Sequence, residues 1–316
     1  LDDTYLTSAP IPHDQVRYAF TPHMNHRFTP AFAVARPLWL DQHLKGTFTF
    51  PQTPGSALIL DTESHIPKFE VTPDPSLPIE QVQLLYSVDP DPQARFWRTA
   101  DATRQGNVWT ADLPILSTDQ PLFALANVHY RLSRPETAPH APPTMQFALT
   151  SLLQTAPPDE LRLSAVVATD APSPVIDDFA RGWKDWYTLS PDNPHHWEYS
   201  TRKLNDPKWR GRPGDTLMLE LRAEQSNELV IILTENFFRP YRGPSRENIA
   251  VAKLSGGQKE TLALLPADFQ TAAGEPLSSW DQIDLLSLRA YHKTEGRTLG
   301  STNWAGPQPQ FLKLYW

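Results

Sequence analysis

The stretch LMLELRAEQSNELVIIL, residues 217–233, gives the clearest indication of the fold class. Apolar side chains stand at every second position of its first seven residues, as in a β-strand with one buried face. The five apolar residues that end it have the length of a buried strand. The stretch therefore predicts two short strands, at 217–223 and 228–233, joined by polar residues.

Proline is the outlier of the composition, because the chain has 33 Pro and only 13 Gly. Proline lacks a backbone donor and blocks helix interiors, so this density favours many short strands joined by rigid loops. No window approaches the ~20 apolar residues that a transmembrane helix needs. The composition predicts a mainly β protein with no membrane partner.

The net charge limits the expected partners, and the absence of cysteine limits the expected chemistry. A net charge of −8, with scattered basic residues, argues against nucleic acid as a partner, because phosphate binding needs a basic face. The chain has no cysteine, which excludes disulfides and thiolate chemistry. Leu1 is not an initiator methionine and no signal peptide is visible, so we expect a processed or truncated piece.

Strand patterns and turn signals divide the chain into three predicted parts, 1–53, 54–155 and 156–316. The middle part alternates as short strands do, with turn residues between the runs, which predicts an Ig-like or fibronectin-like β-sandwich. The last part begins after Ala156-Pro157-Pro158 and holds many further short strands. It carries seven of the ten tryptophans.

The first part differs from the rest. Residues 16–20 have strand character, and Thr29-Pro30 is a typical helix start before an apolar run that ends at Gly46. Pro37 inside this run predicts a kink or two abutting short helices. One strand and one helix cannot bury their apolar faces alone, so this short α/β segment must pack on another part of the protein.

Residues 20–46, FTPHMNHRFTPAFAVARPLWLDQHLKG, resemble the carboxyl end of an α/β-hydrolase domain in dienelactone-hydrolase-like and acetylxylan-esterase-like bacterial proteins. The resemblance implies that His26 is the base of a catalytic triad and that Asp3 is its acid. It also implies a secreted or periplasmic serine esterase. Residues 86–115 and 121–130 look like the β-sandwich domain that trails this hydrolase group.

The catalytic assignment has two open alternatives. Asp3 and His26 could instead be structural or surface residues without a catalytic role. His23 is a rival candidate for the catalytic base. No G-x-S-x-G serine elbow occurs in the chain, so whether it is an enzyme stays open, and an upstream hydrolase segment is an expected partner. His23 and His26, like the adjacent pair His195 and His196, lack a zinc-binding pattern, so no metal site is predicted.

The last part resembles jelly-roll carbohydrate-binding modules. The likeness rests on PVIDDF at 174–179, LLPADF at 264–269 and SWDQI at 279–283. It implies a polysaccharide or oligosaccharide ligand and no cofactor other than an optional structural calcium ion, for which Asp177 and Asp178 could supply oxygen atoms. Some members of that family only make domain contacts.

Aromatic residues in loop-like sequence are the predicted glycan-binding set, because indole faces stack on sugar rings and arginine binds their hydroxyl groups. The alternative for each tryptophan is that it seals the end of the sandwich. The predicted set is Trp183, Trp186, Trp197, Trp209, Arg210, Tyr241 and Trp304. We thus expect either the carboxyl part of a secreted serine esterase or hydrolase that acts on polysaccharide or its ester decorations and whose last domain binds glycan, or a non-catalytic carbohydrate-binding or scaffold protein.

Overall fold

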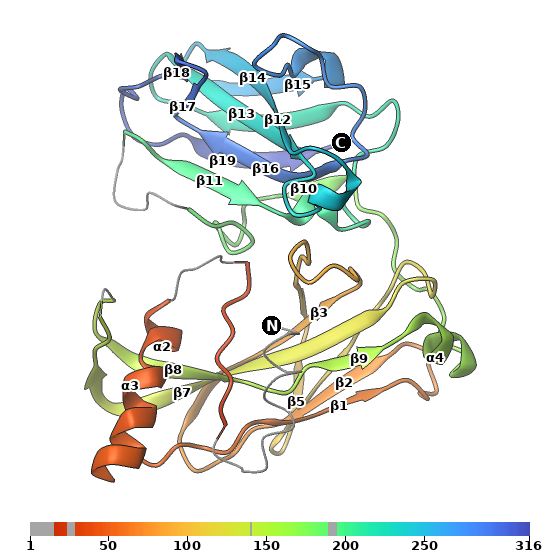
Figure 1. Ribbon diagram of the computed structural model, residues 1–316, viewed down its shortest axis with the longest axis vertical. Helices are drawn as coiled ribbons and strands as arrows, with labels where there is room; N and C mark the ends of the chain where they lie inside the picture. The colour runs from red at the N-terminus through yellow and green to blue at the C-terminus, as the bar shows by residue number, and fades with distance from the viewer. Residues whose placement is uncertain (1–15, 24–28, 140, 189–194) are drawn as a thin grey trace. The chain divides into compact units, whose positions relative to one another are not determined.

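The computed structural model describes residues 16–23, 29–139, 141–188 and 195–316. They form two compact units (Figure 1). The first contains the described residues up to Pro92 together with Trp97–Asp170, and the second contains Gln93–Phe96 together with Ala171–Trp316. Among the described residues, no helix is long and apolar enough to cross a membrane.

The first unit is a sandwich of two antiparallel sheets. One sheet has the order β1-β2-β6-β5 and the other β4-β3-β7-β8, with β9 also paired to β7. Immunoglobulin-type sandwiches divide their strands between two sheets in the same way. The strands are β1 (Gly55–Ile59), β2 (Lys68–Thr72), β3 (Ile79–Ser87), β4 (Arg98–Ala100), β5 (Thr103–Gln105), β6 (Val108–Asp112), β7 (Leu122–Glu136), β8 (Thr144–Thr150) and β9 (Gln154–Ala156).

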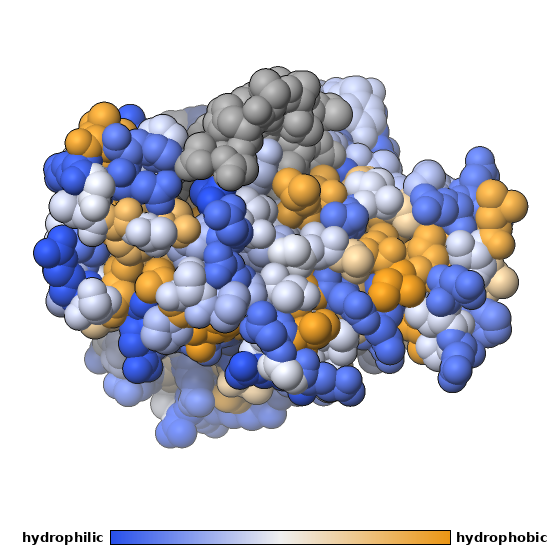
Figure 2. Space-filling view, turned by 90° about the horizontal axis from the view of Figure 1, so that it is seen from below, coloured by the Kyte–Doolittle hydropathy of each residue, from blue (hydrophilic) through white to orange (hydrophobic). Residues whose placement is uncertain are grey.

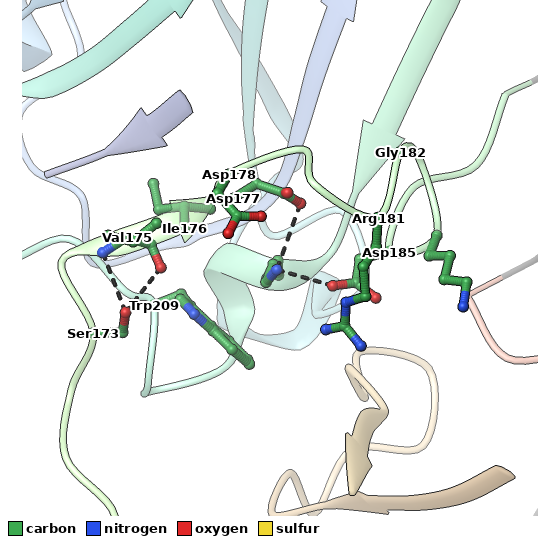
Figure 3. A pocket seen from close by; sticks show the side chains of 11 residues that line it. Ser173, Val175, Ile176, Asp177, Asp178, Arg181, Gly182, Asp185 and Trp209 are labelled. Atoms are coloured by element: carbon green, nitrogen blue, oxygen red, sulfur yellow. Dashed lines mark hydrogen bonds and ion pairs between the residues drawn. The ribbon is translucent and has the colours of Figure 1, made fainter. Parts of the chain in front are cut away.

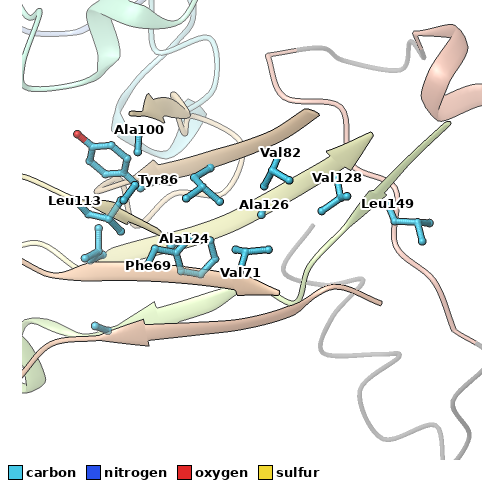
Figure 4. Close-up of a cluster of buried hydrophobic side chains, with 14 of the residues drawn as sticks. Phe69, Val71, Val82, Tyr86, Ala100, Leu113, Ala124, Ala126, Val128 and Leu149 are labelled. Carbon is cyan, nitrogen blue, oxygen red and sulfur yellow. The ribbon is translucent and has the colours of Figure 1, made fainter. Parts of the chain in front are cut away.

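Alternation of side chains along β2 and β7 builds the core of this sandwich. Phe69 and Val71 point from β2 toward Ala124 and Ala126 of β7 in the opposite sheet (Figure 4). The other face of β7 is covered as well, since Leu125 is completely buried in a smaller apolar cluster. A central strand that is buried on both faces reads as a continuous apolar run, which is the sequence of residues 122–126 in β7.

The segment before β1 belongs to the same unit. Tyr18 forms an isolated antiparallel bridge with Thr150, so residues near it extend the sheet beyond β8. The expected helix is broken into α2 (Pro30–Ala33), α3 (Ala35–Leu40) and the π-helical turn η1 (Asp41–Lys45). Val34 and Leu38 join the sandwich core, which is how this short segment buries its apolar side.

Helix α4 (Pro158–Leu163) also packs on the first sandwich. Its Leu161 is completely buried in that core, together with Val166. The first unit therefore continues to Asp170, whose carboxylate accepts a hydrogen bond from the buried Arg98 Nη1 at 3.0 Å.

The second unit has the strand order of a jelly roll. If its eight main strands are counted along the chain, one sheet has the order 1-8-3-6 and the other 2-7-4-5, all antiparallel. The mainly β fold with two sandwiches is thereby confirmed. The strands are β10 (Val175–Asp177), β11 (Glu198–Thr201), β12 (Leu217–Arg222), β13 (Asn227–Glu235), β14 (Arg246–Leu254), β15 (Lys259–Leu264), β16 (Ile283–Arg289) and β19 (Gln310–Tyr315); the hairpin β17 (Tyr291–Thr294) and β18 (Arg297–Gly300) precedes β19.

The two strands predicted from residues 217–233 are β12 and β13. Leu217, Leu219 and Leu221 are buried between the sheets, whereas Met218 and Glu220 between them are only partly buried. On β13, Leu229, Ile231 and Leu233 face the same core, whereas Val230 and Ile232 lie in a separate cluster on the other face. The alternation therefore places β12 at one surface and β13 between two apolar layers.

Candidate functional site

The second unit contains a pocket of about 250 Å³ beside β10 and the loop that follows it (Figure 3). Its walls come from three places in the sequence: residues 173–178, residues 181–185, and Lys203 with Trp209. Seven of the eleven lining residues have polar or charged side chains. The lining residues are Ser173, Val175, Ile176, Asp177, Asp178, Arg181, Gly182, Lys184, Asp185, Lys203 and Trp209.

Lys203 lies at the centre of the pocket's ion-pair network. It begins the 3-10 helix η2 (Lys203–Asn205), and its side chain is only 8% exposed. Its Nζ lies 2.9 Å from Asp185 Oδ2 and 3.5 Å from Asp177 Oδ2. A buried ammonium group needs such partners, because desolvation without them would cost several kcal/mol.

Asp177 fixes the shape of the loop after β10. Its Oδ1 accepts a hydrogen bond from the Phe179 backbone N–H at 2.8 Å, and its Oδ2 accepts one from Trp186 Nε1 at 2.9 Å. Phe179 itself has a left-handed φ of 52°, which an aromatic residue adopts only when its surroundings hold it there. The Asp177 carboxylate therefore closes the loop 178–186 against the sandwich.

The structure gives the predicted calcium ligands other partners. Asp177 is engaged by two N–H donors and Lys203, and Asp178 Oδ1 accepts a hydrogen bond from the Ala180 backbone N–H at 3.0 Å. Across the ranges that the structure describes, no three His, Cys, Asp or Glu side chains gather in a way that could hold a metal ion.

Trp209 is the one aromatic residue among those that line this mainly polar pocket. Its ring meets Phe96 edge to face at 5.3 Å between centroids, and Lys203 Nζ lies 4.9 Å from its centroid. Its carbonyl oxygen accepts a hydrogen bond from Trp316 Nε1 at 2.8 Å. The indole is half-buried and held in place, so it presents a fixed aromatic surface in the pocket wall.

The rim of the pocket carries exposed charges of both signs. Asp178, Arg181 and Lys184 are all exposed, in contrast to the paired charges below them. Carboxylate, ammonium and guanidinium groups together offer both acceptors and donors to a ligand that has many hydroxyl groups.

Three of the predicted glycan-binding tryptophans prove to be core residues. Trp186, Trp197 and Trp304 are 5%, 3% and 1% exposed and belong to the main hydrophobic cluster of the second unit. Trp197 and Trp304 pack edge to face at 4.9 Å, and Trp304 Nε1 donates to Pro307 O at 3.0 Å. A buried indole has no free face to stack on a sugar, so for these three residues the structure supports the alternative that they seal the sandwich.

Other members of the predicted set lie closer to the surface. Trp183 is half-buried and stacks on Tyr199 with 3.7 Å between ring centroids. Arg210 Nη2 donates to Asn205 O at 2.8 Å, which ties it to η2. Tyr241 is 71% exposed and lies on the 3-10 helix η3 (Pro240–Arg242). Of the predicted residues, only Trp209 lines the pocket.

The proposed catalytic pair lies outside the described residues, because the structure describes neither Asp3 nor His26. The rival His23 is described and has a left-handed φ of 59°. The other histidines considered for metal have protein partners: His195 Nδ1 lies 3.1 Å from Trp304 O, and His196 Nε2 lies 2.9 Å from Thr302 O.

Sequence reasoning did not single out Arg181, Lys184 or Asp185. A usable signal existed, because residues 181–186 read RGWKDW and interleave charged residues with two tryptophans. Only the fold could add Lys203 and Trp209 to the same pocket, since η2 is separated from this segment by β11.

The first unit has a hollow of a different character. It has a volume of about 430 Å³ and lies among residues 16–19, helices α2 and α3, Phe50 and Leu149. Its floor is apolar, and the Arg17 guanidinium is already bonded to Pro51 O and Gln52 Oε1. Elsewhere on this unit, the face in Figure 2 shows apolar side chains dispersed among hydrophilic ones, which is ordinary for a protein surface.

Comparison with known proteins adds little to this picture. No protein-family model matches the chain, and no curated protein matches it. One similar solved structure was determined to explain the promiscuous specificity of carbohydrate-binding modules from the β-sandwich superfamily. The alignment covers 84% of this chain and 98% of the chain of that structure, with 7% sequence identity and a TM-score of 0.24. That score is too low to carry an argument, so the fold assignment rests on the strand orders given above.

Proposed function

We propose that the second unit binds carbohydrate in the pocket lined by Trp209. The observation that supports this most directly is the combination of a fixed indole and several charged hydrogen-bonding groups in one pocket. A sugar ring has apolar C–H faces and an equatorial belt of hydroxyl groups. The half-buried indole of Trp209 suits the first, and the polar side chains of the lining suit the second.

The buried network keeps the pocket in one shape before a ligand arrives. Asp177, Asp185 and Lys203 satisfy one another, and Asp177 also holds the backbone of the loop that forms the rim. A preformed site loses less conformational entropy when it binds a ligand. The exposed Asp178, Arg181 and Lys184 remain as the groups that would meet sugar hydroxyls directly.

The test is a binding panel on the full chain. Affinity electrophoresis in gels that contain β-glucan, xylan, mannan or polygalacturonate should retard the protein in at least one of them. Isothermal titration calorimetry would then give the affinity for that polysaccharide. A chain that migrates freely in all four gels, with an intact circular dichroism spectrum, would contradict the proposal.

Substitutions at the rim test whether the ligand binds in this pocket. Arg181→Ala combined with Lys184→Ala should weaken binding about two- to thirtyfold, because each exposed charged contact contributes roughly 0.2–1 kcal/mol. Both side chains are exposed, so the fold should survive. The matched control is Lys253→Ala with Lys293→Ala, which removes two exposed cations on β14 and β17 and should leave binding unchanged.

The hydrolase part of the sequence-based expectation stays a prediction. It depends on Asp3 and His26, which the structure does not describe, and on a serine nucleophile from a further segment. Labelling of the purified protein with a fluorophosphonate, followed by intact mass measurement, tests it. A labelled species heavier than 35.7 kDa would support the esterase, and an unlabelled species at 35.7 kDa would contradict it.

A further inference from the structure

The loop after β13 carries the most exposed aromatic side chains among the described residues of the second unit. Residues 236–243, NFFRPYRG, are called the aromatic loop below. Phe237 is 49% exposed and Tyr241 is 71% exposed. The Arg242 guanidinium carbon lies 6.0 Å from the centroid of the Tyr241 ring. Tyrosine and arginine side chains of this kind are enriched in binding surfaces.

Buried polar groups pin the backbone of the aromatic loop. Asp284 is 2% exposed, and its two carboxylate oxygens accept hydrogen bonds from the backbone N–H groups of Phe237 and Phe238, both at 2.9 Å. Asn236 Nδ2 donates to Gln282 Oε1 at 3.1 Å. The loop is therefore held by side chains of the β16 region and does not depend on a ligand for its shape.

The inward residues of the loop are buried while the outward ones are not. Phe238 packs in a small cluster with Ala94 and Leu285, and Arg239 is 4% exposed. Because Phe238 and Arg239 anchor the middle of the loop, Phe237 and Tyr241 are presented to solvent from a fixed base. Rigid aromatic side chains bind with little loss of conformational entropy.

The aromatic loop and the pocket share their supporting residues. Arg239 Nη1 donates a hydrogen bond to Asn205 Oδ1, at the end of η2. The Arg202 guanidinium carbon lies 4.1 Å from the centroid of the Phe238 ring. The next residue along the chain is Lys203, whose Nζ lies at the centre of the pocket. Within the segment 202–205, Arg202 and Asn205 thus contact the aromatic loop and Lys203 lines the pocket.

We propose that the binding site continues from the pocket to the aromatic loop, so that the second unit binds several consecutive sugars of a polysaccharide chain. This inference rests on the proposed carbohydrate binding and specifies its ligand as a chain rather than a single sugar. One sugar occupies the pocket beside Trp209, and sugars further along the chain stack on Tyr241 and Phe237. The aromatic loop alone could equally suit a protein partner, because Tyr and Arg favour both. Its shared support with the pocket is the reason to assign it to the same ligand.

Oligosaccharide ladders test the inference on the full chain. Calorimetric titrations would use gluco-, xylo- and galacturono-oligosaccharides of two to six units. In at least one series the affinity should rise with length. Tyr241→Ala and Phe237→Ala should each lower the affinity for the hexasaccharide about three- to tenfold, the range expected for one aromatic contact. Both should leave disaccharide binding unchanged, and Tyr241→Trp should retain the wild-type gain with length.

The controls separate this inference from the one on which it rests. Leu265→Ala removes another exposed apolar side chain of the second unit, 51% exposed, and should change nothing. Disaccharide binding with no gain at greater length, or a hexasaccharide affinity untouched by Tyr241→Ala and Phe237→Ala, would overturn the extended site alone. Absence of binding at every length would overturn the extended site and carbohydrate binding in the pocket together.

Discussion

Two groups of aromatic residues in the second unit look alike in sequence and differ completely in the structure. Trp197 and Trp304 are enclosed in the jelly-roll core, whereas Phe237 and Tyr241 stand in solvent on a braced loop. Both groups lie in loop-like stretches beside polar residues. The difference shows that an aromatic residue in a loop is as able to close the end of a sandwich as to form a binding surface.

The hydrogen bonds of the indole N–H groups also distinguish the buried tryptophans from the exposed aromatic residues. Trp186 and Trp304 each donate to a partner within the unit, Asp177 and Pro307 O. A tryptophan whose polar atom is satisfied inside can be buried completely. The exposed Phe237 has no polar atom on its ring, so its exposure is not required by hydrogen bonding and suits a role in binding.

The largest expected effect is on the buried side of this comparison. Trp304→Ala should lower the free energy of unfolding by about 3–5 kcal/mol, because it leaves a large cavity in a dense core. Tyr241→Ala should change it by less than about 0.5 kcal/mol, as surface substitutions do. Urea unfolding followed by circular dichroism measures both. Equal effects of the two substitutions would erase the distinction between core and surface aromatics.

The second prediction concerns the charged floor of the pocket. Lys203→Met should lower the free energy of unfolding by about 3 kcal/mol, since it leaves Asp177 and Asp185 without the cation between them. Lys184→Met, at the exposed rim of the same pocket, should have almost no effect on stability. Chemical denaturation of both variants compares them directly, and a stable Lys203→Met protein would refute the claim that this network holds the pocket.

The third prediction tests the bracing of the aromatic loop. Asp284→Ala removes the acceptor of two backbone N–H groups and should cost about 1–3 kcal/mol of stability. Hydrogen exchange at Phe237 and Phe238 should become faster, whereas exchange at Ile231 in the middle of β13 should be affected only through the loss of global stability. Unchanged protection of the loop amides would mean that Asp284 does not fix the loop.

The smallest effect is expected for Glu247 on β14, the edge strand of the sheet that also contains β13 and β16. The hydrogen bond from His292 to Glu247 lowers the pKa of Glu247, more than its partial burial raises it. A carboxyl whose pKa is lower in the folded state contributes stability above its unfolded pKa of about 4.3, and this contribution is lost as the pH falls.

Glu247→Gln should therefore lower the free energy of unfolding at pH 7 by less than about 1 kcal/mol, because the side chain is 43% exposed. The difference from the wild type should shrink as the pH is lowered below about 4. Denaturation at pH 7 and pH 3.5 measures it. A difference that is constant or grows on acidification would show that the His292 contact does not stabilise the folded carboxylate.

The fold was predictable from sequence because its signal is local and periodic. Alternation in residues 217–223 specified β12, the apolar run at 229–233 specified β13, and the turn residues between runs marked the strands of the first sandwich. Thr29-Pro30 and Gly46 likewise marked the two ends of the helical segment that became α2, α3 and η1. Each of these features depends on neighbours within a few residues.

The candidate site was less predictable because its parts meet only in the folded chain. Trp209 was singled out for its residue type, but nothing in the sequence places it against Asp185 and Lys203. The burial of Trp197 and Trp304 depends on contacts that join the start of β11, the segment between β18 and β19, and the core. Local sequence does not encode these contacts. The exposure of Tyr241 likewise depends on Asp284, which is 43 residues away along the chain.

The central claim is that carbohydrate meets Trp209 and leaves the core tryptophans untouched. Two-dimensional NMR of the indole N–H groups tests it, with the Trp209 and Trp304 signals assigned from Trp209→Phe and Trp304→Phe. Titration with the polysaccharide that retards the protein most should shift the Trp209 signal and leave that of Trp304 in place. A shift of the Trp304 signal without one at Trp209, or no shift at either, would contradict the account.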